Sequence, residues 1–132
     1  MKIKSSINVT DINRHILISI LKRKNYEVTG QKYLKFESIV QTYAGRGFHG
    51  FNPTIIGEYN FEKWNIKINS VLFKSLLFSI TGYIFFWVNE AELTTRIIAS
   101  IVIFFSNLKV NTSIIKTRIE NIESEFRKRE LE

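Results

Sequence analysis

The chain has 132 residues, enough for one small domain, and carries 19 Lys and Arg against 12 Asp and Glu, for a net charge of +7. It has no cysteine, which excludes a disulfide framework and a thiolate metal site. The basic residues are spread out rather than aligned along one helix, so we do not expect nucleic acid as a partner.

The first elements are a strand and a helix. Apolar and polar residues alternate over Ile3–Val9, the period-two pattern of a strand with one buried face. Over Ile12–Lys24 the apolar residues recur at helical spacing, and Thr10 or Asp11 is the predicted N-cap.

Further strand patterns predict a small antiparallel sheet. One is interrupted by a predicted turn at Gly30-Gln31 and resumes over Lys32–Tyr43, and others cover Thr54–Glu62 and Trp64–Asn69. Residues 44–53 hold three glycines and the only proline, so they predict a loop between strands.

This loop is a candidate anion site. Arg46 and His49 lie among its glycines, and such backbone can present N–H groups to a phosphate or a lipid headgroup. A strand rather than a helix follows, which excludes a P-loop, and a plain turn is the alternative interpretation. Lys74, just after the sheet region, is a third candidate contact for an anionic headgroup.

The apolar run Val71–Val88 has the character of a membrane helix. Its eighteen residues give about 27 Å of helix, close to the roughly 30 Å hydrocarbon core of a bilayer. Lys74 is close enough to the start to reach the headgroups, and Trp87 stands where an aromatic belt is expected.

A second apolar run, Ile97–Phe105, is shorter. Twelve residues separate Arg96 from Lys109, about 18 Å of helix, so both cations must extend to the interface. The connector 89–96 is short enough to pair the two runs as a hairpin over 71–110, in which each helix can shelter polar side chains of the other, namely Thr81, Ser100 and Ser106. The predicted interface anchors are Trp87, Arg96 and Lys109.

The charges indicate on which side of the membrane the segments before and after the hairpin lie. Residues 1–70 hold eleven Lys and Arg against five Asp and Glu, a net of +6, whereas the connector has a net charge of −1. The positive-inside rule therefore places both termini in the cytoplasm and the connector outside. The alternative is a soluble domain in which the apolar runs are core helices.

A final amphipathic helix is predicted for residues 111–132. Asn111, Thr112 or Ser113 can cap it, and Ile115, Ile119, Ile122 and Phe126 form its apolar stripe. Ion pairs are expected between Glu123 and Arg127 and between Glu125 and Arg129. We expect this helix to pack on the body formed by residues 1–70.

No catalytic or metal-binding constellation is evident. His15 and His49 stand far apart, without an HExxH spacing, and neither Ser70 nor Ser79 lies in a GxSxG elbow. We therefore expect no catalytic residue, no metal and no cofactor, and we expect that the protein is not an enzyme.

The run Phe48–Gly57, followed by a strand and two apolar helices, resembles a loose group of small uncharacterised bacterial membrane proteins. In that group a Phe-x-Pro-x-Ile-x-Gly-like strand precedes a two-helix hairpin, and the resemblance covers about Phe48 to Phe105. It implies a short cytoplasmic α+β body interrupted by a hairpin, and it implies no activity.

Together these features predict an α+β fold, a small antiparallel sheet with N- and C-terminal helices, interrupted by a two-helix transmembrane hairpin. We expect a non-enzymatic module anchored in the cytoplasmic (inner) membrane that binds the lipid bilayer and either a protein partner or a second copy of itself. The alternatives are a membrane-perturbing or pore-forming effector and a soluble binding domain with very apolar core helices.

Overall fold

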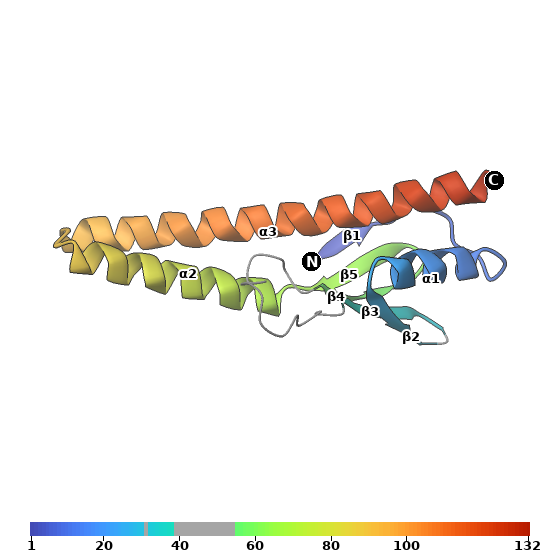
Figure 1. The fold of residues 1–132 in the computed structure, drawn as a ribbon, viewed down its shortest axis with the longest axis horizontal. Coiled ribbons are helices and arrows are strands. Elements are labelled where there is room, and N and C mark those ends of the chain that lie inside the picture. The colour runs from blue at the N-terminus through green and yellow to red at the C-terminus, as the bar shows by residue number, and fades with distance from the viewer. Residues whose placement is uncertain (31, 39–54) are drawn as a thin grey trace. The chain divides into compact units, whose positions relative to one another are not determined.

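The computed structural model describes residues 1–30, 32–38 and 55–132. Within them the chain forms an antiparallel sheet and helices, so the predicted α+β class is confirmed (Figure 1). The elements are β1 (Lys2–Lys4), α1 (Arg14–Arg23), β2 (Tyr26–Thr29), β3 (Leu34–Ser38), β4 (Ile56–Tyr59), β5 (Lys63–Lys67), α2 (Asn69–Val88) and α3 (Leu93–Glu130).

The chain divides into two compact units. The first, which we call the body, consists of Met1–Ile68 together with Ile115–Glu132, and the second, which we call the hairpin, is Asn69–Ile114. The body therefore contains the sheet, α1 and the last part of α3, and the hairpin contains α2 and the first part of α3.

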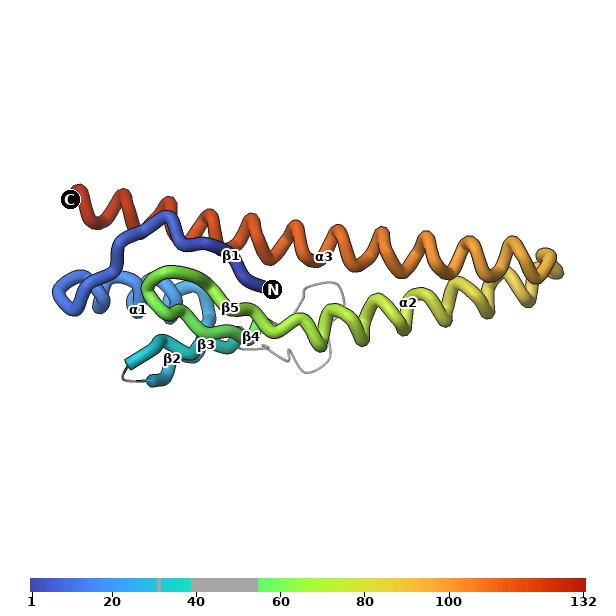
Figure 2. The backbone as a smooth tube through the Cα atoms, turned by 180° about the vertical axis from the view of Figure 1, so that it is seen from behind, coloured from blue at the N-terminus to red at the C-terminus, as the bar shows by residue number. Residues whose placement is uncertain are grey.

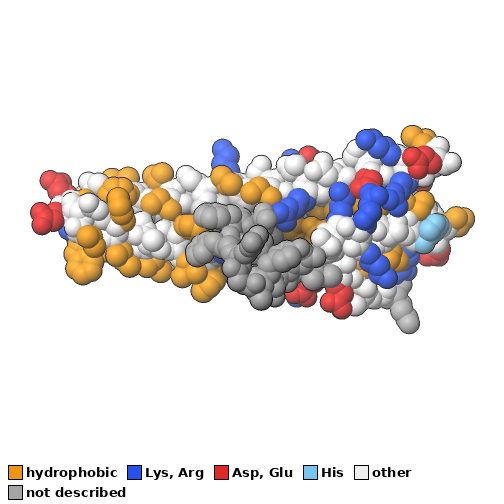
Figure 3. Space-filling model, viewed as in Figure 1, with side chains coloured by type: hydrophobic (Ala, Val, Ile, Leu, Met, Phe, Trp, Pro, Cys, Tyr) orange, Lys and Arg blue, Asp and Glu red, His pale blue; other side chains and the backbone are white. Residues whose placement is uncertain are grey.

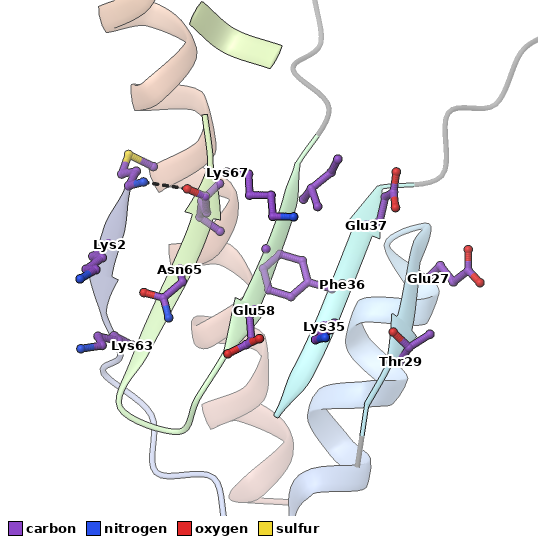
Figure 4. A pocket seen from close by; sticks show the side chains of 14 residues that line it. Lys2, Glu27, Thr29, Lys35, Phe36, Glu37, Glu58, Lys63, Asn65 and Lys67 are labelled. Atoms are coloured by element: carbon purple, nitrogen blue, oxygen red, sulfur yellow. Dashed lines mark hydrogen bonds between the residues drawn. The ribbon is translucent and has the colours of Figure 1, made fainter. Parts of the chain in front are cut away.

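The sheet of the body has the strand order β1-β5-β4-β3-β2, with every neighbouring pair antiparallel. Alternate residues point to opposite faces, and α1 and the last part of α3 cover one face only (Figure 4). Along the middle of the covered face, Phe36 lies opposite Gly57 and Gly57 opposite Ile66.

Large side chains fill the space between the sheet and its two helices. The Phe36 ring meets Trp64 edge-on at 5.5 Å and Tyr26 edge-on at 5.9 Å, and Tyr59 lies 4.4 Å from Trp64 between ring centres. The predicted apolar stripe of the C-terminal helix is confirmed as part of this core, since Ile115, Ile119, Ile122 and Phe126 are all buried.

Gly57 is a glycine because the core leaves no room for a side chain. A Cβ there would lie 2.7 Å from the Phe36 ring and 2.9 Å from Cδ1 of Ile66, both far inside van der Waals contact. The missing side chain lets the Phe36 ring lie against the middle strand of the sheet.

Two predictions for the N-terminal region were wrong. The strand ends at Lys4 instead of Val9, because after Ser5 donates its N–H to Glu62 O the chain leaves the sheet. The α1 helix starts after Asn13, not after Thr10 or Asp11, and the side chain of Asn13 does not cap it. Instead, Asn13 Oδ1 accepts a hydrogen bond from the backbone N–H of Thr10 at 2.7 Å.

The predicted start of a separate helix at residues 111–113 was also wrong, because α3 is unbroken from Leu93 to Glu130. Asn111 donates from Nδ2 to the carbonyl of Asn107 at 2.9 Å, and Thr112 donates from Oγ1 to the carbonyl of Leu108 at 2.9 Å. Their side chains therefore bond to the preceding turn, which is compatible with a helix interior.

The connector of the hairpin is shorter than the predicted 89–96, because α3 already begins at Leu93. The chain reverses through Glu90, which has a positive φ of 57°, and Ala91 donates its N–H to Phe86 O at 3.0 Å. Arg96 thus belongs to the first turn of α3, where its Nε donates to Ala91 O at 2.7 Å. The two helices run back along each other, as Figure 2 shows.

Candidate functional site

The outer surface of the hairpin is apolar over nearly its whole length. Both helices are long and apolar enough to cross a membrane, yet only 11% of the apolar stretch of α2 and 6% of that of α3 are buried in the described structure. Figure 3 shows the hydrophobic side chains gathered over this part of the chain. The exposed ones include Phe73, Ile84, Phe85, Trp87, Ile98, Val102 and Phe105.

Polar side chains of the hairpin meet between its helices. Ser75 Oγ donates to Asn107 Oδ1 at 3.3 Å, and Asn111 Nδ2 donates to the same oxygen at 2.7 Å. Ser79 Oγ donates to the backbone carbonyl of Ser100 at 2.8 Å. We call this set the polar seam. Its hydrogen bonds satisfy polar groups that would cost free energy if they faced hydrocarbon unpaired.

The sequence indicated only part of the polar seam. Ser100 was expected to be sheltered and contributes its carbonyl, but Thr81 and Ser106, which were expected beside it, are exposed. Thr81 bonds within its own helix, donating from Oγ1 to Leu77 O at 2.9 Å. Apolar contact completes the helix pair: a Cβ on Gly82 would collide with the side chain of Ile103.

The three predicted interface anchors lie on the hairpin. Trp87 is in the last turn of α2 and 59% exposed, Arg96 is half-buried in the first turn of α3, and Lys109 is exposed further along α3. The structure contains no bilayer, so their role as anchors stays a prediction. Of the candidate anion contacts, Lys74 is half-buried in α2, whereas Arg46 and His49 lie outside the described residues.

A buried carboxylate joins three segments of the body. Glu123, on α3 and only 4% exposed, accepts hydrogen bonds from Trp64 Nε1 at 2.8 Å and from the backbone N–H of Ser6 at 3.1 Å. The hydroxyls of Ser5 and Ser6 also donate to it. We call this arrangement the Glu123 clamp, because it ties the segment after β1 and strand β5 to α3.

The sequence does not indicate the Glu123 clamp, and its helical spacing predicted an i,i+4 ion pair between Glu123 and Arg127 instead. In the structure Arg127 instead donates to Ser6 Oγ at 2.5 Å. The other predicted pair is confirmed: Arg129 Nη2 lies 3.5 Å from Glu125 Oε1, and Arg23 and Lys24 of α1 pair with the same carboxylate.

Two tyrosines of the core have raised pKa values. Burial raises the pKa of Tyr59 and the charge of Glu123 raises it further, while a hydrogen bond with Ser5, 3.0 Å away, lowers it. Burial likewise raises the pKa of Tyr26, and the neighbouring Arg118 opposes the shift through its charge and a hydrogen bond. Both phenols therefore stay neutral in the folded body to higher pH than in the unfolded chain.

The sheet face without helices is open and strongly charged. It carries an open hollow of about 870 Å³. Figure 4 shows its lining side chains, with lysines on β1 and β5 and carboxylates toward β2. The charged residues of this face include Lys2, Lys63 and Lys67 at one side and Glu27, Glu37, Glu58 and Lys35 at the other.

Comparison with known proteins adds no assignment: no family model, no curated protein and no solved structure matches the chain. In the parts of the chain that the structure describes, no three His, Asp or Glu side chains come together in a way that could hold a metal ion.

Proposed function

We propose that the protein is a membrane-anchored, non-enzymatic module of the cytoplasmic membrane. The hairpin inserts in the bilayer, both termini stay in the cytoplasm, and the body binds a protein partner or a second copy of the chain. The resemblance to small bacterial two-helix membrane proteins supports the same arrangement.

The observation that carries the proposal is the uncovered surface of the hairpin. Exposed large apolar side chains follow both helices, whereas soluble monomers usually expose such side chains singly or in small patches. A core helix of a soluble domain would be mostly buried, which argues against the soluble alternative. Transfer of the same apolar side chains from water into lipid is favourable.

The arrangement of polar groups favours an anchor over a pore former. Ser75, Asn107 and Asn111 face each other across the polar seam, and the outward side chains are mainly large and apolar. A helix pair that lines an aqueous pore needs a polar outer stripe to face the lumen. Gly82, a small residue that allows close helix approach, is already used inside the hairpin against Ile103.

Alkaline carbonate extraction of membranes that contain the full chain tests this proposal. The expected result is that the protein stays in the membrane pellet and enters the detergent phase in phase partitioning. Recovery in the aqueous phase would contradict the proposal and support the soluble alternative. Release of an entrapped dye from vesicles that contain the purified chain would instead support the pore-forming alternative.

A further inference from the structure

The open face of the sheet concentrates positive charge along one edge. Lys2 and Lys4 on β1 and Lys63 and Lys67 on β5 occupy alternate positions of two paired strands, with Lys2 opposite Asn65 and Lys4 opposite Lys63. Trp64 and Ile66, which lie between these positions on β5, are buried on the other face. The four lysines therefore share the open face, on which Figure 4 shows Lys2, Lys63 and Lys67, and we call them the lysine patch.

No ion pair within the described residues neutralises the lysine patch. The three ion pairs found there all use Glu125, on α3. The nearest carboxylates along the strands are Glu58, opposite Asn65, and Glu62, at the turn before Lys63. Like charges directly opposite each other, as in Lys4 and Lys63, destabilise a sheet unless an anion lies against them.

Chain connectivity limits how far Lys67, the last residue of the patch, can lie from the start of α2. Lys67 is two residues before Asn69, the first residue of α2, so their Cα atoms are at most about 7.6 Å apart. This is less than the Debye length of roughly 10 Å at 0.1 M salt. Lys63 is four residues earlier on the same strand, about 13 Å farther along.

The chemistry of the patch fits a phosphate surface better than a nucleic acid. Single-stranded nucleic acids need exposed aromatic rings on which bases can stack, and the aromatic side chain of β5, Trp64, is buried on the opposite face. Clusters of lysine next to a membrane helix are attracted to anionic lipids. One or two such cations near the surface raise the affinity for the lipid about tenfold.

We propose that the lysine patch binds the headgroups of anionic phospholipids in the leaflet from which α2 starts. The recognised group is the phosphodiester anion, held by the ammonium groups of Lys2, Lys4, Lys63 and Lys67. This inference rests on the proposed membrane insertion, since α2 must enter the bilayer for lipid headgroups to lie beside Lys67.

Native mass spectrometry of the full chain in detergent tests this proposal. Delipidated protein is titrated with phosphatidylglycerol and, separately, with phosphatidylcholine, and the lipid-bound fractions are compared. We expect about tenfold tighter binding of phosphatidylglycerol. Replacement of all four patch residues, Lys2→Gln, Lys4→Gln, Lys63→Gln and Lys67→Gln, should remove this preference, and the corresponding Lys→Arg replacements should keep it.

A matched control removes the same charge elsewhere on the body. Lys22→Gln, Lys32→Gln, Lys35→Gln and Lys128→Gln change four exposed lysines, one of them on the open face outside the patch. This control should keep the preference for phosphatidylglycerol. Circular dichroism of each variant confirms that the fold is intact, which is expected because none of the changed side chains is buried.

Three outcomes would overturn the inference. They are equal binding of both lipids by the unaltered chain, loss of the preference in the control, and binding of soluble glycerol phosphate as tight as that of the lipid. Carbonate extraction separates this failure from failure of the proposed function. A chain that stays in the membrane pellet but shows no lipid preference refutes the lysine patch alone.

Discussion

At the scale of single residues, Glu123 is the group on which the polar contacts of the body converge. Its carboxylate is nearly inaccessible and receives hydrogen bonds from Trp64, Ser5 and Ser6. A buried charge is tolerated only when donors satisfy it, so the stability of the body depends on the complete set.

Glu123→Ala should therefore destabilise the body by about 1–3 kcal/mol, because it leaves the buried indole N–H of Trp64 without an acceptor. Glu123→Gln keeps an acceptor and should cost less. The measurement is denaturant unfolding of the full chain in detergent, followed by Trp64 fluorescence in a Trp87→Phe background. Glu120→Ala, at an exposed position of the same helix, should change stability by less than about 0.5 kcal/mol.

The buried tyrosines predict a loss of stability at alkaline pH. The pKa of Tyr59 is raised in the folded state, so the unfolded chain releases its phenolic proton first as the pH rises. The contribution of Tyr59 to the free energy of unfolding is therefore fully present below the unfolded pKa of about 10. It is lost as the pH rises from there through the raised folded pKa. Unfolding midpoints measured from pH 8 to 11 should decrease, and Tyr59→Phe should weaken that decrease. An unchanged slope in Tyr59→Phe would contradict the assignment.

At the scale of elements, the close approach of α2 and α3 depends on Gly82. A side chain there collides with Ile103, so Gly82→Leu should force the helices apart. The chain has no native cysteine, so a Ser79→Cys and Ser100→Cys pair reports helix proximity cleanly. Its oxidative cross-linking should fall about tenfold in Gly82→Leu, the effect of roughly 1.4 kcal/mol of overpacking.

The neighbouring Thr81→Leu provides the control for this experiment. Thr81 is exposed on the outside of the hairpin, so the larger side chain meets no other part of the described helices and cross-linking should be unchanged. Equal loss of cross-linking in both variants would show that Gly82 has no special role in the packing.

Element type and the Glu125–Arg129 pair, one helical turn apart, could be predicted from the sequence, whereas element boundaries and the polar contacts between distant segments could not. Alternation over Leu34–Ser38 and Lys63–Lys67 revealed strands because one face of the sheet is covered and the other open. Asn111 and Thr112 were taken as caps because both residue types favour helix starts. In the structure their side chains bond to Asn107 and to the carbonyl of Leu108, inside the continuous helix α3.

Among the candidate sites, too, some could be predicted from the sequence and others could not. The apolar surface of the hairpin was evident from composition, because a run of large apolar residues is a local property of the sequence. The Glu123 clamp was not, because its main partner, Trp64, is 59 residues away, whereas the wrongly predicted partner Arg127 is one helical turn away. The lysine patch likewise requires the register between β1 and β5, which no local pattern specifies.

At the scale of the whole molecule, the proposed insertion predicts the sidedness of the chain. Single cysteines at Glu92→Cys, in the connector, and Glu132→Cys, at the C-terminus, can be labelled with a membrane-impermeant maleimide in intact spheroplasts. Glu92→Cys should react at once and Glu132→Cys only after permeabilisation, because the basic flanks stay inside. The reverse labelling pattern would contradict the predicted orientation.

The body is assembled from two stretches of chain that are made at different times. When β5 has emerged from the ribosome, Glu123, which accepts the hydrogen bond of the Trp64 indole, has not yet been synthesised. The apolar stripe of α3 that covers the sheet is missing too. All of Asn69–Ile114 must be synthesised before those groups emerge. Synthesis of the hairpin must therefore precede completion of the core, and a chain that stops before Ile115 is left with an uncovered sheet that is exposed to chaperones and proteases.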